Sequence, residues 1–264
     1  MLEINHVYKT FFPGTINEKI ALQDLCVNIP DGEFVTVIGG NGAGKSTMLN
    51  IVAGTIMVDS GSILVDGKDI SKLPEFKRAS LLGRVFQDPM MGTAPTMQID
   101  ENLAIAARRG QKRSLAWGIS KKEREEYREL LKQFSLGLED RLSTKVGLLS
   151  GGQRQALTLL MATLKKPKLL LLDEHTAALD PKTASTVLEL SDKIIRENNL
   201  TTMMITHNMK DAINYGDRLL MLNDGKIILD IKGEEKKKLT VEKLLNQFEK
   251  ASGESFDEDS QILN

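Results

Sequence analysis

The fold of this chain is decided at residues 34–47, which read FVTVIGGNGAGKST. The first five letters form an apolar, β-branched run that is typical of a central parallel strand covered on both faces. The letters that follow fit G-x-x-x-x-G-K-[ST], a glycine loop that joins a strand to a helix. Such a loop turns its amides inward, and the next helix adds free N–H groups and a positive dipole end. We therefore predict a phosphate-binding loop formed by Gly39, Gly40, Asn41, Gly42, Ala43, Gly44, Lys45, Ser46 and Thr47.

A nucleotide is the expected ligand of this loop. Lys45 is predicted to reach the β- and γ-phosphates of ATP, and Ser46 to bind Mg²⁺ through its hydroxyl. The structural alternative is a glycine-rich turn with a solvated lysine. The predicted strand before the loop favours the phosphate site, because the motif requires that context.

The rest of the chain predicts an α/β fold with a mixed sheet. Apolar runs at 169–172 and 202–206 indicate further parallel strands. Asp-Gly pairs at 66–67 and 224–225 separate extended runs and predict hairpins, which add antiparallel strands. Residues from about 96 to 165 show helical patterns and few strand signals, so an α-helical subdomain is expected to be inserted there.

The expected domain boundary lies near residue 232. Residues 1–232 are predicted to form the α/β domain, and 233–264 a C-terminal part. Within that part, Val241, Leu244, Leu245 and Phe248 have the spacing of one amphipathic helix. The acidic end, 253–264, is expected to be disordered.

Two carboxylates, Asp173 and Glu174, follow the run LLLL at 169–172. Ligands of open α/β sheets bind at the carboxyl ends of the strands, so both side chains are expected beside the glycine loop. Asp173 suits a water-mediated contact to Mg²⁺, and Glu174 suits the general base for an attacking water. Acidic residues after a strand also begin ordinary loops, but the glycine loop favours the chemical interpretation.

A second helix start, LSGGQ at 149–153, resembles an anion site. Ser150 and Gln153 have the spacing of a capping box, which by itself predicts only a well-formed helix. The glycines between them leave backbone N–H groups unobstructed. One nucleotide does not easily reach both helix starts of one chain, so we predict a symmetric dimer in which Ser150, Gly151, Gly152 and Gln153 face the partner's ATP.

Bulk composition excludes several other classes. With 35 Lys plus Arg against 36 Asp plus Glu, no overall field attracts nucleic acid or anionic lipid, and we expect no nucleic-acid partner. The single Cys26 cannot form an internal disulfide, and the start lacks a secretory pattern, so a reducing cytoplasm is expected. The apolar runs are far shorter than the roughly 20 residues of a membrane span.

Taken in order, the motifs GGNGAGKST, VFQDP, LSGGQ, LLLLDE, AALD and ITHN resemble the ATP-binding cassette (ABC) ATPases over residues 2 to about 230. The resemblance implies a P-loop NTPase (RecA-like) core. It also implies that Gln87 senses Mg²⁺ and the attacking water, that Asp180 lies across a dimer interface, and that His207 touches the γ-phosphate. An aromatic ring is expected to stack on adenine, with Phe11 as the first choice and Phe12 or Tyr8 as alternatives.

Three of these positions also have structural interpretations. Asp180 followed by Pro181 is a normal helix start. His207 ends an apolar run, where an isolated histidine is more often structural. His175 departs from the family, in which proline commonly follows the glutamate, and its imidazole is a candidate to perturb the neighbouring Glu174.

The resemblance implies an ATPase subunit that dimerises around ATP and drives transport of a small solute through separate permease subunits. The motif sequences resemble those of amino-acid importers, which implies a substrate-binding protein as a further partner. The subunit is expected to lie peripherally on the inner face of the cell membrane. The alternative is an assembly ATPase, as in iron–sulfur cluster building; a chromosome ATPase lacks room for its coiled coil between Gln87 and Ser150, and a nucleotide kinase has no use for a second helix start.

Two surface segments are candidates for membrane-side contacts. Residues 88–97 contain three methionines among turn formers, a composition that suits an adaptable groove for a permease helix, although core packing is the alternative. The basic cluster at 108–113 is interpreted as a solvated loop rather than a lipid contact.

Overall fold

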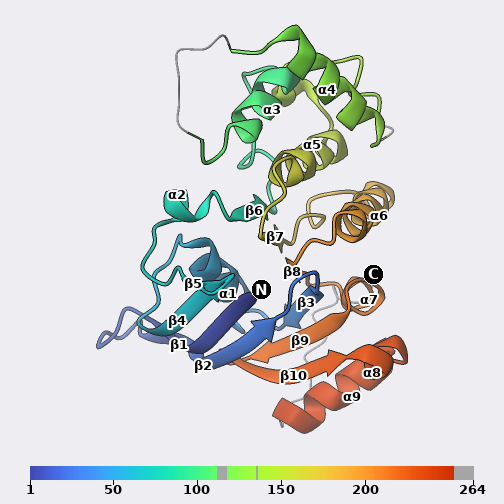
Figure 1. The fold of residues 1–264 in the computed structure, drawn as a ribbon. Helices are drawn as coiled ribbons and strands as arrows, with labels where there is room; N and C mark the ends of the chain where they lie inside the picture. The colour runs from blue at the N-terminus through green and yellow to red at the C-terminus, as the bar shows by residue number, and fades with distance from the viewer. Residues whose placement is uncertain (112–117, 135, 253–264) are drawn as a thin grey trace.

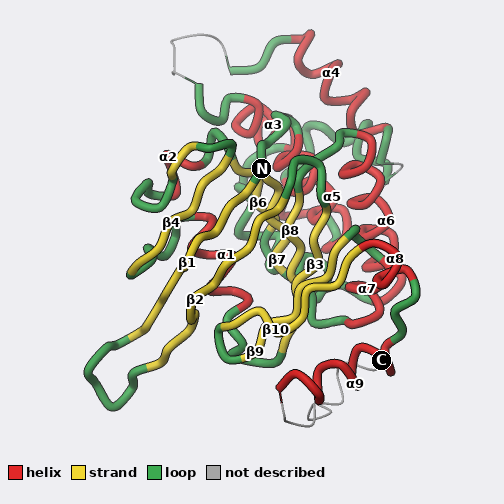
Figure 2. Tube along the Cα trace, turned by 60° about the horizontal axis from the view of Figure 1, so that its bottom comes forward, coloured by secondary structure: helices red, strands yellow, loops and turns green. Residues whose placement is uncertain are grey.

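The computed structural model describes residues 1–111, 118–134 and 136–252, and their strands form two sheets (Figure 1). The smaller sheet is antiparallel and has the order β2-β1-β4-β5. Its strands are β1 (Leu2–Phe11), β2 (Lys19–Ile29), β4 (Ser60–Val65) and β5 (Lys68–Asp69). Figure 2 shows the β1–β2 hairpin projecting away from the second sheet.

The larger sheet has the order β10-β9-β3-β8-β7-β6. Its strands are β3 (Phe34–Gly39), β6 (Leu82–Val85), β7 (Leu169–Asp173), β8 (Thr202–Ile205), β9 (Arg218–Asn223) and β10 (Lys226–Lys232). All neighbouring pairs are parallel except β9 and β10. The predicted mixed sheet is therefore confirmed, and its central strands are apolar because both faces are covered.

The two Asp-Gly pairs form the predicted hairpin turns. Asp66-Gly67 connects β4 to β5, and Asp224-Gly225 connects β9 to β10. In each pair both residues have a positive φ, from 45° to 74°. Two-residue turns with this geometry match the right-handed twist of the strands that they join, which explains the sequence signal.

The helix α1 (Lys45–Ala53) lies between the two sheets. Its apolar side chains share one core with residues of both sheets, so the loop at its start is fixed from two sides. The short helix α2 (Glu75–Arg78) is tied to α1 by Arg78. The helices α6 (Pro181–Glu197) and α7 (Met209–Asn214) belong to two other apolar cores, which also contain residues of the larger sheet. At the far edge of the larger sheet, α8 (Gly233–Lys237) and α9 (Val241–Ser252) pack beside β10.

A separate group of helices stands above the sheets in Figure 1. It consists of α3 (Ile99–Ala107), α4 (Lys121–Lys132), the short 3₁₀ helix η1 (Val146–Leu148) and α5 (Gly151–Thr163). Their buried apolar residues form a core of their own, which α6 meets through Leu190 and Ile194. In the described part of the chain, no helix is long and apolar enough to cross a membrane.

Candidate functional site

The glycine loop lies at the carboxyl end of β3, and two of its glycines have no room for a side chain. Gly39 has φ +151°, and a Cβ there would stand 2.3 Å from the carbonyl oxygen of Leu222. Gly44 has φ +103°, and its Cβ would stand 2.6 Å from the carbonyl oxygen of Ala21. Both positions need glycine because neighbouring strands press on the loop backbone.

Lys45 is held inside the loop. Its Nζ donates to the carbonyl oxygens of Gly39 and Gly40, at 2.7 and 2.9 Å, and the residue is only 8% exposed. Burial lowers the pKa of Lys45, and the negative charge of Glu174 opposes that effect. The lysine cation therefore lies at the loop in a partly desolvated state. A phosphate group bound there would supply the negative charge that the lysine lacks.

Asp173 is the last residue of β7 and Glu174 follows it, and the two have different partners. An oxygen of Asp173 accepts a hydrogen bond from Arg84 Nη2 at 3.0 Å, and the same nitrogen donates to Asn50 Oδ1 at 2.8 Å. Arg84 thus joins β6, β7 and α1. No motif in the sequence indicates Arg84, whose only local signal is a charge inside a short apolar strand.

Glu174 has an unusual backbone and an imidazole neighbour. Its φ is +44°, and its N–H donates to the carbonyl oxygen of Ile205 on β8. His207 Nδ1 lies 3.6 Å from Glu174 Oε2. The imidazole lowers the pKa of Glu174 against the opposing effect of burial, and the carboxylate in turn raises the pKa of His207. Glu174 is therefore ionised at neutral pH, as an acceptor of a proton must be.

His175 points away from Glu174. It is buried, and its Nε2 lies 3.1 Å from Ser191 Oγ on α6. Burial lowers the pKa of His175 to about 4, so this imidazole is neutral. The imidazole that perturbs Glu174 is His207, and the hypothesis that His175 does so is wrong, because successive residues at a strand end point to opposite sides.

A cavity of about 210 Å³ lies over the loop. It is lined by Phe11, Lys19, Ala21, residues 41–47 and Glu174. Phe11 and Lys19 face each other across the β1–β2 ladder. Lys19 belongs to no motif, so the sequence did not indicate its place at this cavity. Of the aromatic candidates, Phe11 lines the cavity, whereas Phe12 is 65% exposed and Tyr8 is 42% exposed, and neither is part of the lining.

The other predicted residues lie outside this cavity. Gln87 is exposed, just beyond β6. Ser150 and Gln153 form the predicted capping box at the start of α5, and Asp180 caps α6 through a bond from the Thr183 N–H. The described residues of one chain therefore do not bring the α5 start into the lining of the glycine-loop cavity.

Gly152 has a packing reason of its own. A Cβ at this position would stand 2.2 Å from Thr183 Cγ2, so α5 and α6 approach too closely there for any other residue. At the basic cluster, Arg108 binds the carbonyls of Ala104 and Gly118, and Arg109 binds those of Ala162 and Lys165. These two arginines therefore stabilise the helical group through bonds to its backbone. Residues 112–113 lie outside the described part of the chain.

Oxygen donors of the kind that Mg²⁺ prefers gather at the same edge. Asp173 ends β7 and Glu174 follows it, Ser46 lies in the first turn of α1, and α1 contacts β7. Carboxylates and a hydroxyl fit a hard cation better than a soft one. A glycine loop with a buried lysine, beside an acidic pair at the carboxyl edge of a parallel sheet, defines a P-loop nucleotide-binding protein.

Comparisons with known proteins narrow this class. A family model described as ABC transporter matches residues 22–177. The chain is 50% identical over 252 residues to the tyrosine transport ATP-binding protein of Clostridioides difficile (strain R20291), covering 95% of this chain and 100% of that protein. The chain belongs to the ABC transporter family, of which it is an ATP-binding, ATP-hydrolysing subunit.

More distant similarities agree with this assignment. The chain is 34% identical to a spermidine/putrescine import ATP-binding protein of Mesoplasma florum, covering 86% of this chain and 60% of that protein. Among solved structures, a dimeric ATP-binding cassette in a post-hydrolysis state with ADP and Pi aligns with a TM-score of 0.75 at 30% identity. That alignment covers 88% of this chain and 98% of the cassette.

Proposed function

We propose that this subunit powers the uptake of a small solute, an amino acid with tyrosine as the first candidate, through separate membrane permease subunits. The observation that carries the proposal is the 50% identity, over 95% of the chain, to a protein named for tyrosine transport. The resemblance of the segments VFQDP and DEHTAALDP to those of amino-acid importers supports the same class of substrate. The named relatives above are transport proteins, which favours transport over the assembly-complex alternative.

Within one chain, we assign the phosphates of ATP to the glycine loop, residues 39–47, and the adenine to Phe11. Phe11 lines the same cavity as the loop and lies next to the cation of Lys9, 5.6 Å from its ring centre. Glu174 takes a proton from the attacking water, and its ionised state supports that role. We assign His207 a contact with the γ-phosphate, and its Nδ1, 3.6 Å from Glu174 Oε2, supports a role beside the general base.

Mg²⁺ would be held by Ser46, Asp173 and Gln87, and when bound it neutralises charge on the phosphates. Arg84 fixes the orientation of Asp173 through the 3.0 Å bond. Gln87 lies in the exposed segment that leads from β6 toward the helical group, so it is suited to report the state of the site to that group.

A second copy completes the site in this proposal. The α5 start, with Ser150, Gly151, Gly152 and Gln153, and the exposed Asp180 lie outside the glycine-loop cavity of their own chain. A similar cassette has been solved as a dimer with ADP and Pi. Two ATP molecules between two copies would close the dimer, and loss of phosphate after hydrolysis would release it.

The permease is proposed to dock at a cavity of about 1220 Å³ between the end of β6, α3 and α5. Met91, Met97 and Ile105 line this cavity, and Met91 is 68% exposed. Flexible thioethers beside apolar and basic groups suit a short helix of a partner. Docking there would hold the subunit on the inner face of the cell membrane, with a substrate-binding protein supplying the solute from outside.

Uptake into vesicles tests the proposal. The subunit is captured from native membranes, its companions are identified, and the purified complex is placed in liposomes with ATP inside. We expect labelled tyrosine to accumulate, with competition by unlabelled tyrosine but not by spermidine. Companions that are assembly proteins, or a complex that moves spermidine and not tyrosine, would contradict the proposal.

The docking surface has its own test. Met91→Asp is expected to reduce capture of the permease by about tenfold or more, because it puts a charge into a desolvated contact. The control is Met57→Asp, since Met57 is 41% exposed but lies outside this cavity. Equal capture by both variants would place the docking surface elsewhere.

A further inference from the structure

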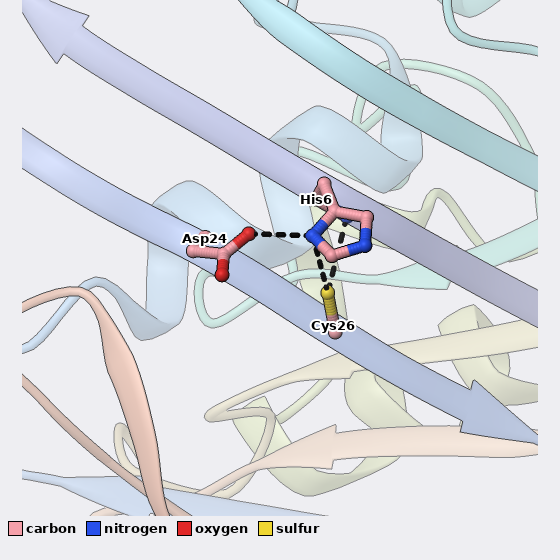
Figure 3. Close-up of side chains that lie close together, drawn as sticks. All are labelled: His6, Asp24 and Cys26. Atoms are coloured by element: carbon pink, nitrogen blue, oxygen red, sulfur yellow. Dashed lines mark hydrogen bonds and ion pairs between the residues drawn. The ribbon is translucent and has the colours of Figure 1, made fainter.

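An exposed group of three metal-ligating side chains lies on the β1–β2 ladder. His6 on β1 faces Asp24 and Cys26 on β2 (Figure 3). Their candidate ligand atoms all lie within 4.8 Å of one another. None of the three lines the glycine-loop cavity, and the ATPase mechanism uses none of them.

The backbone brings these side chains together through two irregularities in the ladder. The register shifts between the pairs Ile4↔Val27 and Val7↔Leu25, and it shifts back before Lys9↔Leu22. His6 and Asp24 stand at these two bulges with φ of +49° and +52°, which is rare for residues other than glycine. Bulges re-aim side chains and often stand beside functional sites. Here they turn His6 toward the face that Asp24 and Cys26 share.

The distances suit one ion among the three side chains. His6 Nδ1 lies 3.4 Å from Cys26 Sγ and 2.7 Å from Asp24 Oδ1. A tetrahedral Zn²⁺ with bonds of about 2.0 Å to nitrogen and 2.3 Å to sulfur separates those two ligands by about 3.5 Å. Asp24 has to move back by roughly half an ångström to give Zn²⁺ room. Its side chain is 53% exposed, and the hydrogen bond that it also shares with Tyr8 would have to adjust to that movement.

We propose that His6, Asp24 and Cys26 form a zinc site with a fourth position open to water. Nitrogen, sulfur and oxygen ligands together favour Zn²⁺ over Mg²⁺, which prefers oxygen alone. Binding replaces the hydrogen bond between His6 and Asp24 with two metal–ligand bonds and releases the thiol proton of Cys26 to solvent.

A second contact prepares the sulfur for this role. The backbone N–H of His6 donates to Cys26 Sγ at 3.2 Å. Such a bond stabilises negative charge on sulfur and fixes its direction, as outer-shell contacts do at metal sites. The ion would fasten β1 to β2 a few residues before Phe11.

Cobalt absorption tests the site directly. The nucleotide-free, reduced protein is titrated with Co²⁺, and the near-ultraviolet thiolate-to-cobalt band is followed. Cys26 is the single cysteine of the chain, so this band reports no other site. We expect the band to saturate at one ion per chain and to disappear when an equimolar amount of Zn²⁺ is added.

Variants distinguish a site with three ligands from Co²⁺ binding by the cysteine alone. Cys26→Ser is expected to abolish the band, and His6→Ala and Asp24→Asn to weaken Co²⁺ binding at least about tenfold. The control is Asn28→Ala, on the same exposed face of β2, which should bind as the natural chain does. Thermal unfolding without metal checks that each variant is folded.

Three results would overturn the proposal. The first is the absence of a thiolate band at millimolar Co²⁺. The second is unchanged affinity in His6→Ala, which would leave the cysteine acting alone. The third is a band that forms only as the protein dimerises by sedimentation, because the sulfur ligands would then come from two chains.

Discussion

The starts of α1 and α5 both have glycines beside them, and they are built in opposite ways. At α1 the cap is Gly44, and no described side chain caps it. At α5 the cap is Ser150, which exchanges hydrogen bonds with Gln153. The first start lies at a cavity lined by Phe11 and Glu174, whereas at the second start Ser150 and Gly151 are exposed.

This difference shows how a helix end becomes a binding site. Uncapped N–H groups at α1 are enclosed by side chains of the same chain, so a phosphate can replace the missing cap there. At the α5 start, the Ser150 side chain already accepts a hydrogen bond from a free N–H group of the helix. The other contacts that would complete an anion site there must come from another chain. In our proposal the α1 start binds ATP without help from a second chain, and the α5 start contacts ATP only in a dimer.

The largest effect is expected at the cavity of the first start. Glu174→Gln should lower ATP turnover by about 10²- to 10⁴-fold, because the proton acceptor is lost while the phosphate loop is intact. ATP should still bind, and the variant should accumulate as a closed dimer on a sizing column. The control is Glu197→Gln, a glutamate on the exposed end of α6. Unchanged turnover in the Glu174 variant would remove it from the role of base.

A smaller effect is expected from the cation of the same start. Lys45→Ala should weaken ATP binding by about 10- to 150-fold, since a charge-assisted hydrogen bond contributes about 1.5–3 kcal/mol. Lys19→Ala is the matched control, because Lys19 lines the same cavity without a place in the motif. Titration with a fluorescent nucleotide measures both, and equal losses would show that the loop lysine has no special contact.

The second start can be tested against another capped helix. Ser150→Ala and Ser120→Ala both remove the serine of a capping box, at α5 and at α4. Each should cost about 1 kcal/mol of folding free energy. Only Ser150→Ala should also weaken ATP-dependent dimerisation, by about tenfold. If both variants dimerise equally well, the α5 start is a structural cap and the proposed contact across the dimer fails.

The smallest effect concerns the pair of His207 and Glu174 within the first cavity. His207 has a raised pKa when folded, so its stabilisation is full below its ordinary value of 6.5 and is lost as pH rises through the folded pKa. Glu174 has a lowered pKa, so its contribution is present above 4.5 and is lost as pH falls through the folded pKa. The pair therefore stabilises most between those two ordinary values.

Thermal unfolding of His207→Gln against the natural chain measures this pair. The difference in Tm should be largest between pH 4.5 and 6.5 and should shrink above that range. It should stay below about 4 °C, because His207 is half exposed and exposed pairs contribute little. A Tm difference that is constant from pH 5 to 9 would mean that the two groups do not interact as charges.

Much of the fold followed from local patterns. The Asp-Gly turns, the run before the glycine loop and the Ser150 capping box each depend on residues within a few positions of one another. The structure confirms all of them. Phe11 stays a prediction as the adenine contact, although the cavity lining supports it over Phe12 and Tyr8.

The contacts that the sequence did not indicate join distant segments. Arg84 reaches Asp173 only because β6 and β7 are neighbours in the sheet. Lys19 reaches the glycine loop through the β1–β2 hairpin, and His6 reaches Cys26 through a bulge. The periodicity of a single sequence does not show which strands pair or where the register between two strands shifts.

The sequence by itself determined that a glycine loop stands between a strand and a helix, since turn and cap chemistry depend on neighbouring residues. Only the tertiary structure decided which imidazole meets the Glu174 carboxylate. His175 is adjacent in the chain but packs on Ser191, whereas His207 comes from the end of the next strand, β8. The physical reason is that a strand end sends successive side chains to opposite sides, while parallel pairing places distant residues together at one edge of the sheet.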